Sequence, residues 1–298
     1  MDYFYIGDGR AIVRLRNGLD LAVPMQDPFI GAPMALARQW DPLLEATVTA
    51  MVKPGQRCIN VGANIGYFTT LMAHHCGPAG HVYAFEPSTA NVDLLCYNLQ
   101  LNRVSHWVHV YRAAVSNASG ALPFVTPASY SDGRVLPKEG LEVTDKPRFD
   151  PHGLMTWRGN SYVGAQVEEV PAVTLDHILG TAGPFDFLLC DAEGFDSSIL
   201  LGARHLISRF RERLTIVFEW NGPDFHQYFE SATLDRVFNM LELLGYVTAW
   251  SENRDWNDTT PQTWKPFIYR GNGLLGRHGN ILCRPAALGH DGVPGMAA

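Results

Sequence analysis

The 298-residue sequence predicts an α/β fold in which a mostly parallel sheet carries helices on both faces. Three observations support this prediction. Short apolar runs alternate with helical stretches from Arg57 onward, a glycine-containing turn follows the first run, and an acid ends the second. A hydrophobic content of 46% provides a core of this size without disulfides.

The N-terminal part is expected to form an extension ahead of the main domain. Asn17 and Gly18 separate two runs of alternating apolar and polar residues, which predicts a hairpin. Pro42 lies near the start of a helical stretch over 40–52, as proline often does. The predicted parts are a hairpin and helical extension (1–54), a main domain (55–285) and a mobile tail (286–298).

In the main domain, stretches with the pattern of a strand alternate with stretches that have the 3.6-residue period of a helix. The strands are expected at 57–61, 81–86, 107–115, 185–190 and 214–220, with a closing pair at 246–250 and 279–285. The helices are expected at 67–76, 88–102, 196–208 and 234–245. Ser88 is a favourable N-cap, and Gly77 is a typical helix end. Residues 126–165, rich in Pro, Gly, Ser, Lys and Asp, break the alternation and predict an inserted lid or substrate loop.

The turn after the first strand reads "INVGANIGYFT" and does not fit a dinucleotide. A loop that binds NAD needs glycine at position 64 and glycine or alanine at position 67, but this chain has Asn64 and Tyr67. Glu86 ends the second strand, about 20 residues after Gly66, where a carboxylate can accept hydrogen bonds from both ribose hydroxyls. These features favour an adenosine ribose without phosphates, as in S-adenosylmethionine. A plain turn beside an exposed acid is the alternative interpretation.

Three motifs give the sequence a resemblance to a known family. The G-A-N-I-G-x-x-T, F-E-P and D-x-E-G blocks follow one another within 11–206 as in the FkbM family of S-adenosylmethionine-dependent methyltransferases. The resemblance implies a Rossmann-like class I methyltransferase fold, with a seven-stranded sheet whose last strand is antiparallel. It also implies O-methylation of a hydroxyl of a sugar, glycoconjugate or natural product. The cofactor contacts that it implies are Gly62, Asn64, Gly66, Glu86 and, near adenine, Ser116. Asp191 is a further candidate for cofactor binding, as is Asn60.

One position departs from the family pattern. The family usually has Asp where this chain has Asn60, and that Asp often orders the loop or faces the methionine amino group. An amide can still form hydrogen bonds, so the departure bears on cofactor affinity.

Polar residues at the ends of two later strands are candidates for the chemistry. Methyl transfer to a hydroxyl requires removal of its proton, which a general base or a metal can assist. In one hypothesis the base is Asp191, Glu219 or His226. In the other, Asp191, Glu219 and Asn221 bind Mg²⁺ through oxygen ligands. Helix capping is a structural alternative for Asp191 and Glu193.

Composition indicates which kinds of molecule the protein is expected to bind. The formal net charge of −7 and the dispersed basic residues argue against nucleic acid. The N-terminus lacks the features of a signal peptide, no run approaches the ~18 apolar residues of a membrane span, and the five cysteines form no CxxC pair. We therefore expect a cytoplasmic protein acting on a small-molecule or glycan acceptor, with a homodimer compatible with the sequence. A non-catalytic cofactor-binding module and a nicotinamide-dependent oxidoreductase are the competing hypotheses.

Overall fold

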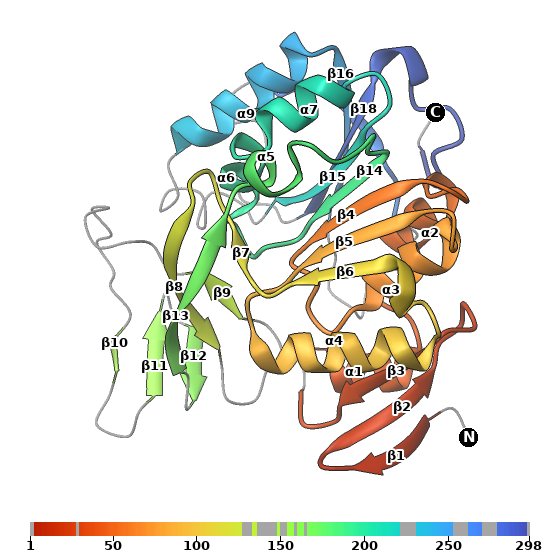
Figure 1. Ribbon diagram of the computed structural model, residues 1–298, viewed down its shortest axis with the longest axis vertical. Coiled ribbons are helices and arrows are strands. Elements are labelled where there is room, and N and C mark those ends of the chain that lie inside the picture. Colours follow the sequence, from red (N-terminus) through yellow and green to blue (C-terminus); the bar gives the residue numbers. More distant parts are fainter. Residues whose placement is uncertain are drawn as a thin grey trace.

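An eight-stranded sheet forms the centre of the molecule, with helices on both sides (Figure 1). The computed structural model describes residues 3–27, 30–126, 133–135, 148–149, 154–157, 160–163, 166–220, 231–252, 262–269 and 279–296. The strand order is β17-β16-β18-β15-β14-β4-β5-β6. The strands are β4 (Arg57–Val61), β5 (His81–Phe85), β6 (Val108–Tyr111), β14 (Phe187–Cys190), β15 (Thr215–Trp220), β16 (Tyr246–Glu252), β17 (Lys265–Phe267) and β18 (Gly279–Pro285).

The pairing confirms the predicted class I fold. Strands β6, β5, β4, β14 and β15 run parallel, and β18 is antiparallel to both of its neighbours, β15 and β16. The sheet differs from the predicted seven strands because β17 pairs with β16 at the edge. This three-residue strand, Lys-Pro-Phe, is too short to show an alternating pattern, and proline is tolerated at a sheet edge.

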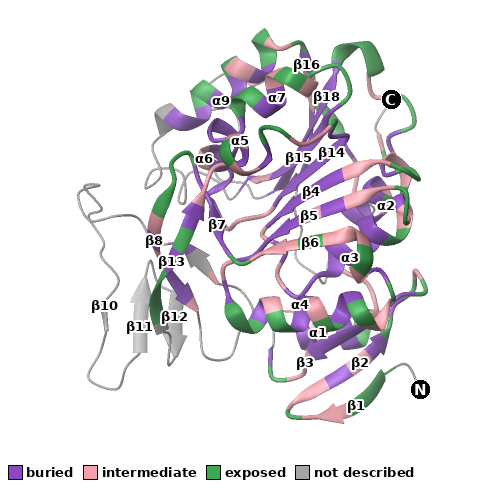
Figure 2. Ribbon diagram, in the orientation of Figure 1, coloured by how far each residue is buried: buried purple, intermediate pink, exposed green. Residues whose placement is uncertain are grey.

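Two groups of helices cover the sheet, and each packs on its own hydrophobic cluster. Helices α2 (Pro42–Met51), α3 (Tyr67–Cys76) and α4 (Thr89–Leu101) lie on one face (Figure 1). Helices α5 (Leu175–Leu179), α6 (Asp196–Leu201), α7 (Arg204–Phe210) and α9 (Ser231–Leu243) lie on the other. The central strands between them are almost wholly buried (Figure 2).

Local signals explain where several helices begin and end. Asp41 caps α2 by accepting a hydrogen bond from the Leu44 N–H, and Ser88 caps α4 by accepting one from the Asn91 N–H. The helix expected over 196–208 is instead divided into α6 and α7 at Gly202. The chain is tightly packed there, since a Cβ on Gly202 would lie 2.1 Å from the carbonyl oxygen of Ser116.

A three-stranded N-terminal sheet packs beside α4. It consists of β1 (Tyr3–Gly7), β2 (Arg10–Arg14) and β3 (Asp20–Pro24) and is followed by α1 (Gly31–Ala37). The hairpin predicted around Asn17 and Gly18 is the antiparallel β2–β3 pair, and β1 adds a third strand to it. Asn98 of α4 and Asn102, the residue that caps its C-terminus, form hydrogen bonds with β3, and Asn98 also reaches Ile65 in the turn after β4, so this sheet is joined to the main domain near that turn.

A smaller sheet lies between β6 and β14 in the chain. Its order is β7-β13-β8-β9, formed by β7 (Ala114–Val115), β8 (Gly120–Thr126), β9 (Arg134–Val135) and β13 (Gln166–Val173). A three-stranded sheet follows β9 in the chain, formed by β10 (Arg148–Phe149), β11 (Leu154–Trp157) and β12 (Asn160–Val163). Much of the predicted loop over 126–165 lies outside the described residues, and its role as a lid stays a prediction.

The C-terminal residues reach back to the N-terminal extension. Trp264 is fully buried, pairs with Met296 and donates a hydrogen bond to Thr47 Oγ1 at 2.9 Å. Val293 is also buried. The domain boundaries and the mobility of the tail stay predictions.

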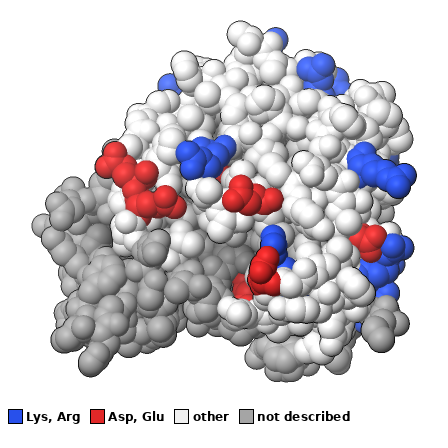
Figure 3. Space-filling view, turned by 60° about the horizontal axis from the view of Figure 1, so that its bottom comes forward, with Lys and Arg blue, Asp and Glu red and all other residues white. Residues whose placement is uncertain are grey.

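Two surface observations bear on partners. Among the described residues, no helix combines the length and the apolar character that a membrane crossing requires. On the face drawn in Figure 3, the basic side chains of the described residues lie in separate places and form no continuous patch.

Candidate functional site

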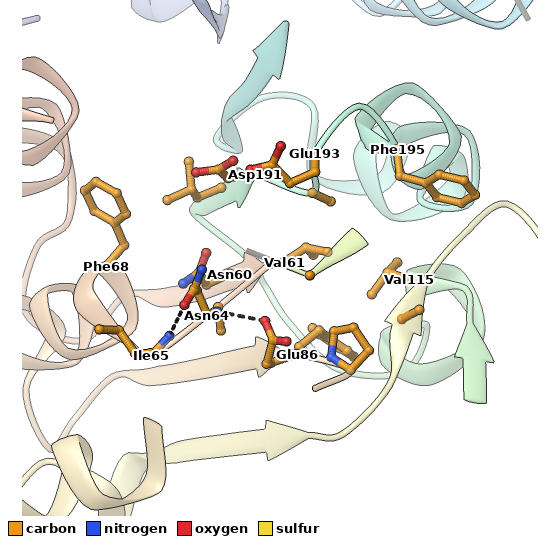
Figure 4. A pocket seen from close by; sticks show the side chains of 18 of the residues that line it. Asn60, Val61, Asn64, Ile65, Phe68, Glu86, Val115, Asp191, Glu193 and Phe195 are labelled. Carbon is orange, nitrogen blue, oxygen red and sulfur yellow. Dashed lines mark hydrogen bonds between the residues drawn. The ribbon is translucent and has the colours of Figure 1, made fainter. Parts of the chain in front are cut away.

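A cavity of about 230 Å³ opens at the carboxyl ends of β4, β5 and β14 (Figure 4). Ligands bind at this edge in open α/β sheets because the loops after the parallel strands meet there. Of the predicted cofactor residues, Asn60, Gly62, Asn64, Glu86 and Asp191 line it. Residues distant in sequence therefore meet at one place, while their roles in binding stay predictions.

Gly62 is required by close packing at the start of the loop. Its φ is +76°, in the left-handed region that favours glycine. A Cβ at this position would lie 1.8 Å from the carbonyl oxygen of Asp191. The backbone after β4 therefore touches the backbone after β14, and no side chain fits between them.

The rest of the loop leads directly into α3. Asn64 also has a positive φ of 48°, and its Oδ1 accepts a hydrogen bond from the Ile65 N–H at 2.7 Å. Gly66 has a φ of +95° and is the N-cap of α3, where a Cβ would lie 2.5 Å from Leu95 Cδ1 of α4. Gly66 does not line the cavity among the described residues, and its effect is on the shape of the turn.

Glu86 is bound to the glycine loop. Its side chain is 4% exposed, and its Oε2 accepts the N–H of Asn64 at 2.8 Å (Figure 4). Its Oε1 accepts the N–H of Ser88 at 2.9 Å and the side-chain amide of Asn91 at 3.4 Å. Backbone and amide donors hold this carboxylate in one orientation at the cavity wall. It lies beside the glycine loop, as the sequence predicts.

Asn60 is ordered by a buried hydroxyl. Its side chain lines the cavity, is 2% exposed and donates a hydrogen bond from Nδ2 to Thr69 Oγ1 at 2.8 Å. The carbonyl oxygen is then the acceptor that this side chain offers to a ligand. An acceptor oxygen is thus kept where the family usually has a carboxylate, but without the negative charge.

Ser116 lies outside the lining of the cavity. Its backbone N–H donates to the carbonyl oxygen of Val173 at 2.9 Å, and its residue is 4% exposed. Ala113, Ala114 and Val115 line the cavity in this segment instead. With Phe195, they give this end of the cavity an apolar wall.

Three carboxylates gather on the other side of the cavity, where Asp191 and Glu193 line it and Glu219 lies next to them, outside the lining. One oxygen from each of Asp191, Glu193 and Glu219 lies within 4.8 Å of the other two. Figure 4 shows Asp191 and Glu193 opposite Glu86. Glu193 has a φ of 52° and precedes Gly194 with a φ of 90°, so a tight turn returns its side chain toward Asp191. We call Asp191, Glu193 and Glu219 the acid trio; the other candidates, Asn221 and His226, lie outside the described residues.

A fourth acid lies behind the trio. Asp196 is fully buried at the start of α6, and its carboxyl oxygens make no hydrogen bond of normal geometry. Burial, and then the charge of Asp191, raise the pKa of Asp196 to about 7, although the backbone N–H groups of Ala192 and Glu219 are near enough to lower it in part.

The N-terminal extension supplies a wall that the sequence did not reveal. Met34 and Trp40 line the cavity together with Tyr67. The hydroxyl of Tyr67 donates to the carboxylate of Glu45 and accepts the N–H of Trp40 at 3.1 Å. Burial, and then this bond to Glu45, raise the pKa of Tyr67. No local motif marks these residues, because they reach the cavity through tertiary packing.

A curated protein matches part of this chain. The chain is 26% identical over 155 residues to the methyltransferase sdnD of Sordaria araneosa, a match that covers 48% of this chain and 59% of that protein. The matched region thus spans about three fifths of that relative.

Two solved structures are also similar, at low sequence identity. The O-methyltransferase TomG of Streptomyces achromogenes, involved in tomaymycin synthesis and in complex with S-adenosylmethionine, has a TM-score of 0.46 and 12% identity, covering 83% of this chain and 81% of TomG. An O-methyltransferase of Bacillus cereus in complex with S-adenosylhomocysteine has a TM-score of 0.45 and 12% identity, covering 85% of this chain and 86% of that chain.

The family comparison covers the glycine loop, Glu86 and the acid trio together. The family model described as "Methyltransferase FkbM domain" matches residues 60–248, from Asn60 in β4 to the middle of β16. This match covers more than half of the chain. It includes the end of β4 and all of the parallel strands β5, β6, β14 and β15. The chain therefore belongs to the FkbM methyltransferase family.

Proposed function

We propose that this protein transfers a methyl group from S-adenosylmethionine to a hydroxyl oxygen of a sugar, glycoconjugate or natural product. The observation that supports it best is the bond between Glu86 and the glycine loop. A fixed carboxylate at the end of β5 suits two ribose hydroxyls, and a side chain at Asn64 leaves no close approach for a pyrophosphate. The cofactor supplies an electrophilic methyl group when bound.

The cavity has chemically distinct sides that suit the parts of this cofactor. The apolar wall with Val115 and Phe195 suits the adenine ring, and Glu86 suits the ribose. Asn60 and the loop backbone suit the amino-acid end. The described lining residues include acids but no Lys, Arg or His, which favours a ligand that carries positive charge.

The acid trio supports the removal of the acceptor proton. Asp191 and Glu193 lie across the cavity from Glu86, so a hydroxyl held between the two sides is near a carboxylate that can accept its proton. Asp191, on the cavity wall, is our proposed base, and Glu219, whose carboxylate lies beside it, is the alternative. The protein's main contribution is then orientation of the acceptor oxygen toward the methyl group.

Binding of the cofactor tests the proposal and the role of Glu86 together. We expect calorimetric titration to show that S-adenosylmethionine and S-adenosylhomocysteine bind the protein. Glu86→Ala is expected to weaken binding by at least about 1 kcal/mol, because hydrogen bonds to a charged acceptor are lost. Glu168→Ala, at an exposed position of β13, is the control and should bind as the unchanged protein does. No binding of either ligand at millimolar concentration would contradict the proposed function.

A bound Mg²⁺ is the alternative to a carboxylate base. Three carboxylate oxygens in one group can attract a cation, and Mg²⁺ prefers oxygen ligands. If a carboxylate acts alone, we expect Mg²⁺ to produce no binding heat in protein stripped with EDTA. Saturable binding that disappears in Asp191→Asn would favour the metal route instead.

A further inference from the structure

Asn98 of α4 and Asn102, the C-cap of that helix, lie one turn apart and hold the same strand of the N-terminal sheet. Asn98 Oδ1 accepts the N–H of Ala22 at 2.7 Å, and its Nδ2 donates to the carbonyl oxygen of Ala22 at 3.1 Å. Asn102 makes the same pair of bonds with Asp20, at 3.0 and 2.6 Å. Each side-chain amide thus satisfies both backbone groups of one residue in β3.

The two asparagines differ in their third hydrogen bond. Asn98 Nδ2 also donates to the carbonyl oxygen of Ile65 at 2.8 Å, within the glycine loop. Asn102 Nδ2 donates instead to the backbone carbonyl of Asn98 at 2.8 Å, within its own helix. Of these two side chains, Asn98 alone joins the N-terminal sheet to the loop.

The orientation of Asn98 is fixed by its partners. The side chain is fully buried, and its two N–H groups face two carbonyl oxygens while its oxygen faces an N–H. If the amide were flipped, Oδ1 would face both carbonyl oxygens, and none of the three hydrogen bonds could form. The backbone partners therefore allow one orientation of the amide.

Ile65 lies at the centre of the loop whose shape the cofactor requires. On one side, the N–H of Asn64 is held by Glu86; on the other, Gly66 rests against Leu95. A change in the position of the Ile65 carbonyl would therefore disturb the peptide group that meets Glu86.

We propose that Asn98 is a positioning residue that holds the glycine loop through the Ile65 carbonyl and thereby couples cofactor binding to docking of the N-terminal sheet. This inference rests on the proposed function of the loop. Because coupling of this kind is reciprocal, an ordered sheet favours cofactor binding, and bound cofactor stabilises the contact at Ala22.

The matched variants Asn98→Asp and Asn102→Asp test the inference. Each carboxylate can still accept the N–H from β3, and each loses its two donor bonds. In Asn98→Asp one lost bond is to the loop, so we expect S-adenosylhomocysteine to bind about tenfold more weakly in calorimetry. Asn102→Asp should bind it within about twofold of the unchanged protein, because its third bond stays within α4.

Hydrogen exchange measured by mass spectrometry reports whether the ligand slows exchange in β3. A loss of stability alone would not remove this effect of the ligand. We expect S-adenosylhomocysteine to slow exchange at Ala22 in the unchanged protein and in Asn102→Asp, but not in Asn98→Asp. If Asn98→Asp does not fold, Asn98→Ser and Asn102→Ser form the replacement pair, with urea unfolding confirming that each is folded during titration.

The outcomes separate the inference from the function on which it rests. Absence of S-adenosylhomocysteine binding to the unchanged protein would contradict the proposed function. Binding by the unchanged protein, with equal affinity in the two members of a pair, would overturn the role of Asn98 alone.

Discussion

Gly62→Ala is expected to weaken cofactor binding by about a hundredfold or more and to destabilise the fold. An alanine at a positive φ costs about 1 kcal/mol. The larger effect is steric, because the new Cβ would lie 1.8 Å from the Asp191 carbonyl oxygen. Both atoms belong to backbone segments, so the ends of β4 and β14 must separate, which we expect to add about 2–3 kcal/mol of destabilisation. Urea unfolding and calorimetric titration measure the two effects.

Gly55→Ala is the matched control for this experiment. Gly55 has a φ of +83°, close to that of Gly62, but a Cβ there would meet no atom within 4 Å. It therefore incurs the conformational cost without the clash. Equal destabilisation in the two variants, with cofactor binding retained in Gly62→Ala, would show that the contact with Asp191 does not restrict the loop.

The second large effect concerns pH and the buried Asp196. Its pKa is raised from 3.8 to about 7, so the folded protein holds the proton more tightly than the unfolded chain. The stability that this proton provides is complete below about pH 4 and is lost as pH rises toward 7. Across that window, Asp196 is expected to lower the free energy of unfolding by about 4 kcal/mol, after which its contribution is constant.

Urea unfolding at a series of pH values tests this expectation. Asp196→Asn cannot ionise, so the fall in stability between pH 4 and 7 should become shallower in this variant. Asp8→Asn is the control, because the Asp8 side chain is 87% exposed and its replacement should leave the pH dependence unchanged. The same slope in Asp196→Asn and in the unchanged protein would contradict the assignment to Asp196.

The sequence was sufficient for features that depend on short stretches of chain. The β4 turn could be predicted because Gly62 and Gly66 lie between a strand and a helix, and the interval to Glu86 fits the next strand. The parallel sheet followed from the alternation of strand and helix periods. Ser88 identified the start of α4 through the capping chemistry of its own side chain.

Features that depend on distant contacts could not be predicted in this way. Trp40 reaches the cavity only because the N-terminal extension folds against α3, and Asn98 resembles any other helical asparagine until β3 is placed beside it. Strands β8 and β13 were missed because Pro123 and Pro171 interrupt the usual strand pattern, although in the ladder Pro123 pairs with Glu169 and Pro171 with Ala121. Glu193 joins Asp191 through the positive φ of a turn, which residue types alone do not reveal.

The small sheet between β6 and β14 allows the shape of the cavity to change during evolution without changes to the central sheet. Phe124 and Val135, on β8 and β9, line the cavity, yet their strands form backbone ladders only within the small sheet. A substitution or a change of length there can reshape the ligand space while the hydrogen bonds of the eight-stranded sheet stay intact. New acceptor preferences can therefore arise on this wall independently of the scaffold that holds Gly62 and Glu86.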